Sequence, residues 1–164
     1  MRKILVLGLG NDLYGDDAIG LHVIDRLRRE DRHSDGGGAR FKGVDFIPCS
    51  LTGLALLDVI ADYDTLIIVD TIKREAPETG RITILDAAEL RHIPGPSPHY
   101  VSIPQAIEIG KKAGLRMPSS IKVVAVESRN MHTMGEGLSE EMTRALPTIV
   151  DRTRKLIIGS LDRD

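Results

Sequence analysis

Asp17, Asp70 and His99 are the residues of this 164-residue chain whose types suit a metal-dependent reaction. Two carboxylates roughly 5 Å apart repel each other by about 3 kcal/mol at an effective dielectric of ~20, and a divalent cation removes that repulsion. Two oxygen ligands and one imidazole suit zinc, nickel, cobalt or iron better than calcium or magnesium. Because the three residues come from separate segments, the fold must bring them together.

Asp17 lies in a glycine-rich, acidic loop that reads Gly-Leu-Gly-Asn-Asp-Leu-Tyr-Gly-Asp-Asp-Ala-Ile-Gly at residues 8–20. An apolar strand is expected before this loop, and an amphipathic helix is expected at about residues 19–30. A dinucleotide-binding loop would need a small residue three positions after Gly10, where Leu13 stands, and it would offer bare amides to a pyrophosphate. The three acids of the loop favour a cation instead.

Further strand and helix patterns alternate along the rest of the chain. Strands are expected at about residues 41–47, 64–70, 81–85 and 122–126. Three further helices are expected: one that begins near Gly53, one at about residues 103–113 with Ser102 as its N-cap, and a last one with Ser139 as its N-cap. Asp70 should follow the third strand and Glu127 the last, with structural hydrogen bonding the safer interpretation of Glu127. His99 lies in a proline-framed segment, residues 94–99, which we expect not to be helical.

This alternation predicts the architecture of the protein. Strands that are apolar on both faces are typical of a parallel sheet covered by helices. We therefore expect a single domain over residues 1–164, an α/β three-layer αβα sandwich with a largely parallel sheet and one antiparallel edge. Sites in such folds lie at the carboxyl ends of the strands, so Asp17 and Asp70 should meet there, within reach of His99.

Composition excludes several classes of partner. A net charge of −2, three Tyr, two Phe and no Trp offer nucleic acid little attraction or stacking. Cys49 is the only cysteine, which excludes an intrachain disulfide and fits a reducing compartment. No stretch approaches the length of a membrane span, and the first apolar run is too short for a signal peptide. We expect a cytoplasmic monomer with no nucleic-acid or membrane partner.

Each candidate residue also has an ordinary structural interpretation. Asp17 could stabilise the amino end of the helix that follows it, and Asp70 could cap a turn. His99 taken alone is more often a loop residue than a ligand. We expect Asp16 to be a supporting or solvated residue, and Cys49 to be a small buried hydrophobe rather than a nucleophile.

The chain resembles the nickel-iron hydrogenase maturation endopeptidases over nearly its whole length. The resemblance rests on Ile-Leu-Val-Leu-Gly-Leu-Gly-Asn at 4–11 with Asp-Asp-Ala-Ile-Gly at 16–20, Leu-Ile-Ile-Val-Asp at 66–70, Ser-Pro-His at 97–99 and Gly-Glu-Gly-Leu-Ser at 135–139. It implies a hydrogenase maturation protease-like fold, of the phosphorylase/hydrolase-like group.

The resemblance also implies an activity. Such an enzyme removes the carboxyl-terminal extension of a hydrogenase large-subunit precursor after nickel insertion. Asp17, Asp70 and His99 match the family's metal-contacting positions, and the nickel is supplied by the precursor, so no tightly bound intrinsic metal is expected. Three ligands without a thiolate would hold free nickel loosely. When the nickel is already held by precursor cysteines, those cysteines and the three ligands would together complete its coordination shell. With no serine elbow or Cys-His motif, attack by water is favoured.

One loop departs from the family pattern. Pro48-Cys49-Ser50-Leu51 stands where the family usually has Asp-Gly-Gly-Thr, in a loop that faces the substrate. The difference bears on which precursor is recognised, or on proteolysis itself. It leaves open a non-catalytic module that checks nickel in the precursor or chaperones it. Independently of the loop, a metallohydrolase with its own zinc and a Rossmann-type binding module are further alternatives.

Overall fold

Five strands form one sheet in the order β2-β1-β3-β5-β4. The computed structural model describes residues 2–33, 40–51, 53–86, 88–89, 98–135 and 137–162, with the side chains of 98–102 excepted. The strands are β1 (Ile4–Leu9), β2 (Val44–Cys49), β3 (Thr65–Ile72), β4 (Ile82–Asp86) and β5 (Ser120–Glu127). All neighbours pair in parallel except β4, which is antiparallel to β5. The expected largely parallel sheet with one antiparallel edge is confirmed.

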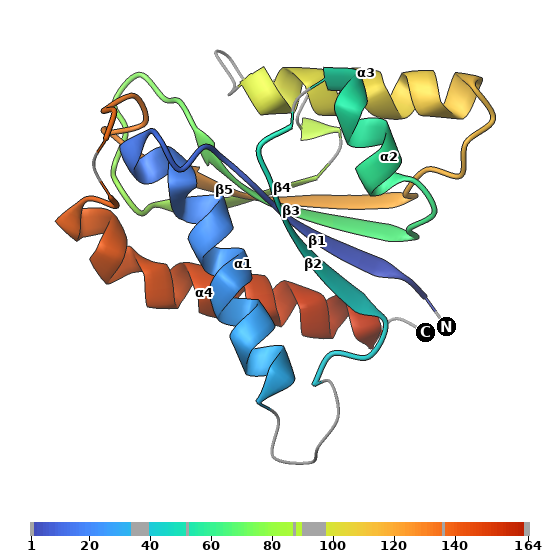
Figure 1. The fold of residues 1–164 in the computed structure, drawn as a ribbon, viewed down its shortest axis with the longest axis horizontal. Coiled ribbons are helices and arrows are strands. Elements are labelled where there is room, and N and C mark those ends of the chain that lie inside the picture. The colour runs from blue at the N-terminus through green and yellow to red at the C-terminus, as the bar shows by residue number, and fades with distance from the viewer. Residues whose placement is uncertain are drawn as a thin grey trace.

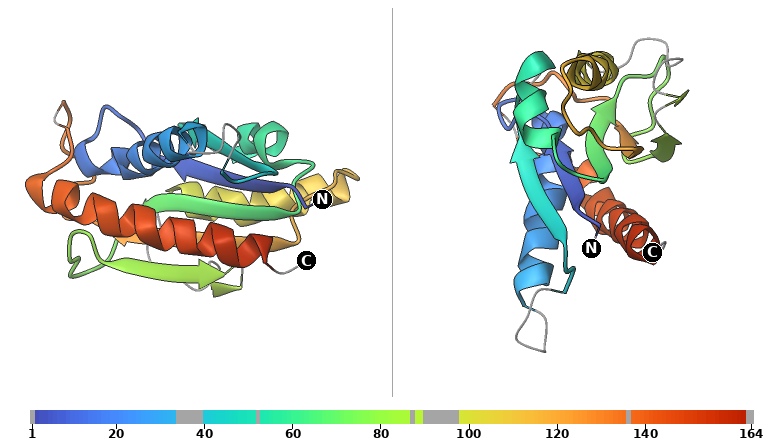
Figure 2. Two further views of the ribbon diagram at one scale, coloured as in Figure 1. Left: turned by 90° about the horizontal axis from the view of Figure 1, so that it is seen from below. Right: turned by 90° about the vertical axis from the view of Figure 1, so that its right-hand side faces the viewer.

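Helices cover both faces of this sheet (Figure 1). One face carries α1 (Ile19–Arg32) and α4 (Glu140–Leu161). The other carries the 3-10 helix η2 (Gly53–Leu56), α2 (Leu57–Ile60) and α3 (Pro98–Lys112). Figure 2, turned to show the sheet from two other sides, gives the same three layers. A second 3-10 helix, η1 (Gly15–Ala18), connects β1 to α1.

Strand alternation divides the interior into two cores. On β1, Ile4 and Val6 join the core under α1 and α4, whereas Leu5, Leu7 and Leu9 join the core on the opposite face. Every residue of β1 and β3 is buried, as expected for central strands of a covered parallel sheet. Within the described ranges, no helix is both long and apolar enough to cross a lipid bilayer.

Several expected element boundaries are wrong, including that of the second strand, which runs Val44–Cys49 and not 41–47, and two of them concern candidate residues. Strand β3 continues to Ile72, so Asp70 lies inside the strand rather than after it. Helix α3 begins at Pro98, so Ser102 lies within the helix instead of capping it, and His99 belongs to the first helical turn. Proline suits a first helical position because it lacks the amide hydrogen that has no partner there.

The amino end of α4 forms as the sequence predicts. Ser139 is the N-cap, and its hydroxyl oxygen accepts a hydrogen bond from the Met142 amide at 3.2 Å. The apolar side of the helix, which includes Met142 and Ile149, is buried against the sheet. This cap fixes the point at which α4 starts, close to the loop that carries Asp17.

Candidate functional site

The acidic loop lies directly against the carboxyl end of β1 because glycines leave room for the backbone. A Cβ atom on Gly8 would lie 2.2 Å from the carbonyl oxygen of Gly20, and one on Gly20 would lie 2.3 Å from that of Leu9. A Cβ atom on Gly10, whose φ is +155°, would lie 2.0 Å from the carbonyl oxygen of Asp17. Carbon and oxygen atoms that are not bonded to each other do not approach so closely, so these glycines allow η1 and α1 to pack on β1 and place Asp17 at its end.

The carboxylate of Asp17 is held by two donors from different elements. Its Oδ2 accepts from the amide of Asn11 at 3.1 Å, in the loop after β1. Its Oδ1 accepts from the hydroxyl of Thr71 at 2.7 Å, on β3. Asp17 is half-buried and Thr71 is fully buried. Hydrogen bonds to both oxygens of an ionised carboxylate are strong and fix its orientation.

Asp70 is fully buried near the end of β3, and the same threonine holds it. Its Oδ1 accepts from the amide of Thr71 at 2.8 Å. Strand β1 pairs with β3 in a register that aligns Gly8 with Val69, so the end of β1 lies beside Asp70. The structure therefore joins two of the three predicted site residues through Thr71, at the carboxyl edge of the sheet.

His99 is the second residue of α3, but its side chain lies outside the described residues. Among the side chains that are described, no three His, Cys, Asp or Glu form a group that could hold a metal ion. The role of His99 as a third metal-contacting residue stays a prediction.

Asp16, expected to be a supporting or solvated residue, is fully buried, so the solvated alternative is wrong. Its Oδ1 accepts from the Ser139 amide at 2.7 Å. Its Oδ2 accepts from the hydroxyls of Ser128 at 2.7 Å and Ser139 at 3.0 Å. The amide of Asp16 donates to the carbonyl oxygen of Asn130 at 3.3 Å. Asp16 thus ties η1 to the connection between β5 and α4, and it supports the neighbouring Asp17.

Glu127, the last residue of β5, has the structural role that was the safer interpretation. It is 6% exposed, and its Oε2 accepts from the amide of Glu78 at 3.0 Å. Its Oε1 lies 3.9 Å from Nε of Arg74. Both partners belong to the connection between β3 and β4, so Glu127 holds that connection against the end of β5.

The atypical segment, whose Pro48 and Cys49 end β2 and whose Ser50 and Leu51 belong to the loop after it, lies beside the acidic loop. The carbonyl oxygen of Cys49 accepts from the amide of Gly10 at 3.2 Å. The Cys49 thiol is buried and accepts from the amide of Leu51 at 3.4 Å, which confirms it as a small buried residue. The Leu51 side chain is 46% exposed. A partner that reaches Asp17 would therefore also meet this loop.

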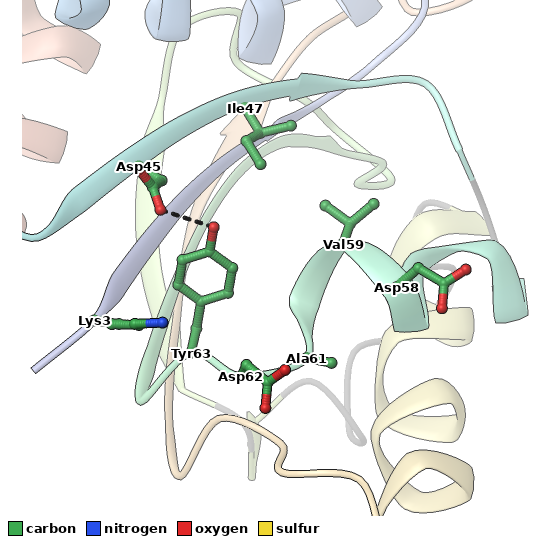
Figure 3. A pocket seen from close by; sticks show the side chains of 8 residues that line it. All are labelled: Lys3, Asp45, Ile47, Asp58, Val59, Ala61, Asp62 and Tyr63. Atoms are coloured by element: carbon green, nitrogen blue, oxygen red, sulfur yellow. Dashed lines mark hydrogen bonds between the residues drawn. The ribbon is translucent and has the colours of Figure 1, made fainter.

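A pocket of about 440 Å³ lies at the other end of the sheet (Figure 3). Its lining includes Lys3, just before β1, Asp45 near the start of β2, and Tyr63, just before β3. The Tyr63 hydroxyl donates to Oδ2 of Asp45 at 2.9 Å. Since all three residues belong to the amino ends of parallel strands, this pocket is separate from the edge that carries Asp17.

The phenol of Tyr63 should make stability depend on alkaline pH. Burial, then the hydrogen bond to Asp45 and its charge, raise the pKa of Tyr63 from 10.0 to about 12. The pKa of Tyr63 is higher in the folded state than in the unfolded state. The protonated phenol therefore contributes to the free energy of unfolding in full below about pH 10, and this contribution is lost as the pH rises towards about 12. We expect the free energy of unfolding to fall more steeply over that window in the wild type than in Tyr63→Phe, as denaturant titrations at each pH would measure. Asp45→Asn should reduce the difference, and equal slopes for wild type and Tyr63→Phe would contradict the assignment.

The sequence and the fold are both similar to those of known proteins. A family model described as hydrogenase maturation protease, HycI, matches residues 22–155. The hydrogenase 2 maturation protease of Escherichia coli K12 is 29% identical over 126 residues, which cover 76% of this chain and 72% of that protein. The solved structure of the hydrogenase maturating endopeptidase HybD from E. coli matches with a TM-score of 0.77 and 26% identity, covering 98% of this chain and 94% of that one.

A more distant structure agrees on the fold. The [NiFe] hydrogenase maturation protease HycI from Thermococcus kodakarensis KOD1 matches with a TM-score of 0.70 at 22% identity, covering 95% of this chain and 92% of that one. At that identity the likeness concerns the fold alone. Together with HybD, it confirms the three-layer α/β architecture expected from the sequence.

Proposed function

Because the chain belongs to the hydrogenase maturation protease family, we propose that it removes the carboxyl-terminal extension of a nickel-iron hydrogenase large-subunit precursor after nickel has been inserted. The observation that carries the proposal is the junction at Thr71, which links the Asp17 and Asp70 carboxylates. Asp17 is half-buried at the carboxyl edge of a parallel sheet, where a cation presented by a partner would be met, and Thr71 connects it to the buried Asp70.

In this proposal the nickel is part of the substrate. Asp17, Asp70 and His99 contact a nickel ion already held by precursor cysteines, and the protease holds no metal of its own. Oxygen and imidazole ligands without a thiolate bind free nickel weakly, so a precursor that lacks nickel would not be held at this edge. Cleavage would then report that the metal has been loaded.

The cleavage step is proposed to use water as the nucleophile. The substrate-held nickel would either polarise the scissile carbonyl or position the chain for attack. The part played by the protease is to keep two carboxylates oriented: Asn11 and Thr71 donate to Asp17, and the Thr71 amide donates to Asp70. The exposed Leu51, beside this edge, would meet the precursor and contribute to the choice of substrate.

The proposal is tested by incubating the purified protein with its cognate precursor, with and without nickel loading, and measuring the precursor's mass. We expect a discrete loss from the carboxyl end only in the nickel-loaded sample, because the acids recognise the precursor through its metal. Unchanged mass with a stable complex would instead identify a non-catalytic checkpoint. Stoichiometric zinc that survives dialysis of the protein would identify a metallohydrolase.

A further inference from the structure

Thr71 donates two hydrogen bonds, one to each candidate carboxylate. Its amide donates to Oδ1 of Asp70 at 2.8 Å, and its hydroxyl donates to Oδ1 of Asp17 at 2.7 Å. Its side chain is completely buried within β3. We propose that Thr71 is a positioning residue, which aims the Asp17 carboxylate at the metal of the bound precursor. This inference rests on the proposed function.

The threonine side chain is well suited to this task. Its branch at Cβ restricts χ1, so the hydroxyl of a buried threonine on a strand has a fixed direction. A hydroxyl carries one proton, and here that proton is donated to an ionised acceptor, which makes a short and strong bond. Valine has the same shape but no donor. Serine keeps the donor but lacks the methyl group that fixes its direction.

The hydrogen bonds leave part of the Asp17 carboxylate available. Each carboxylate oxygen can accept at two lone-pair positions. The Thr71 hydroxyl occupies one position on Oδ1, and the Asn11 amide occupies one on Oδ2. As far as the described residues show, one position on each oxygen therefore remains for a ligand. Without the hydroxyl, Asn11 would be the one described donor left to the carboxylate, which could then turn about its terminal torsion.

A purely structural role is the alternative, since a buried hydroxyl needs an acceptor wherever it lies. Thr153 offers the matched comparison because it is also completely buried, and its hydroxyl donates to the carbonyl oxygen of Ile149 at 2.8 Å within α4. Loss of either hydroxyl should affect stability. Only loss of the Thr71 hydroxyl should affect how the protein distinguishes nickel-loaded from nickel-free precursor.

The experiment compares Thr71→Val, Thr71→Ala, Thr71→Ser and Thr153→Val with the wild type. We expect Thr71→Val and Thr71→Ala to lower kcat/KM for nickel-loaded precursor by about 10- to 100-fold, the range for loss of a hydrogen bond to a charged group. Their Kd for nickel-free precursor should not change, while their Kd for nickel-loaded precursor should rise. Thr71→Ser should restore most of the activity, and Thr153→Val should match the wild type. Valine keeps the shape of threonine and alanine does not, but both lack the hydroxyl. Equal losses of kcat/KM in the two variants would therefore be due to the missing donor and not to a packing defect.

Three results would overturn the inference. One is a Thr71→Val protein that cleaves as fast as the wild type, and another is a serine variant as impaired as valine. The third is an equal loss of affinity for nickel-loaded and nickel-free precursor, which indicates general damage. A wild-type protein that leaves nickel-loaded precursor uncut would count against the proposed protease function instead, so the two failures are distinguishable.

Discussion

Asp17→Asn is expected to leave the chain folded and to slow cleavage of nickel-loaded precursor by roughly 10³-fold, which corresponds to about 4 kcal/mol of lost metal contact. The amide has the shape of the carboxylate, and it can be accommodated by the same neighbours. Its oxygen can accept from the Asn11 amide, and its nitrogen can donate to the Thr71 hydroxyl oxygen. What disappears is the negative charge, so the effect should fall on the chemistry rather than on the fold.

The same loss is expected for Asp70→Asn and for His99→Ala, because all three side chains contact the same ion in the proposal. The measurement is the initial rate of trimming of nickel-loaded precursor, with unfolding curves to verify that each variant is folded. Asp12→Asn is the matched control, since it removes an exposed charge from the same loop. A variant that trims the precursor at the normal rate would remove its residue from the site.

Asp16→Ala is expected to have the largest effect on stability, about 3 to 5 kcal/mol. The substitution leaves the Ser139 amide and the hydroxyls of Ser128 and Ser139 without their acceptor in a fully buried place. Natural domains have only about 5 to 15 kcal/mol of stability in total, so the variant should be close to unfolding at ordinary temperatures.

Denaturant unfolding of wild type, Asp16→Ala and Asp16→Asn would measure this effect. Asp16→Asn should cost less, because its oxygen can still accept from the Ser139 amide and its nitrogen can donate to the two hydroxyls. Asp12→Ala, exposed in the same loop, should change the free energy of unfolding little. A loss below about 1 kcal/mol for Asp16→Ala would show that these hydrogen bonds contribute little net stability.

The sheet was predictable because its strands obey strong local rules. β1 and β3 are continuous apolar runs, which indicate central parallel strands, and the alternation at residues 81–85 indicates the antiparallel edge. The N-cap at Ser139 was also readable, since its hydroxyl bonds to an amide only three residues later. Asp17 and Asp70 could be selected because acids near the ends of such strands reach a common edge.

The partners of these acids could not be predicted, because they come from distant parts of the chain. Nothing in the sequence near Asp16 indicates that it is buried against Ser128 and Ser139, and its polarity suggests exposure. Thr71 was missed because β3 was expected to end at Asp70. The strand in fact continues to Ile72, which pairs with Glu127 on β5, and this pairing is visible only in the folded sheet. The local signal for Thr71 was the apolar Ile72, which continues the strand pattern beyond Asp70.

The residues that donate hydrogen bonds to Asp16 and Asp17 lie far along the chain from them, and this separation has a consequence for biosynthesis. Asp17 receives its hydroxyl donor from 54 positions further along the chain, and Asp16 is anchored by Ser139, 123 positions further along. Closing the long loops between such distant segments costs chain entropy before the contacts are gained. A growing polypeptide that has left the ribosome only as far as β3 lacks Ser128 and Ser139, which donate hydrogen bonds to Asp16 in the folded protein. The acidic loop can therefore be fully anchored only after residue 139 has been synthesised.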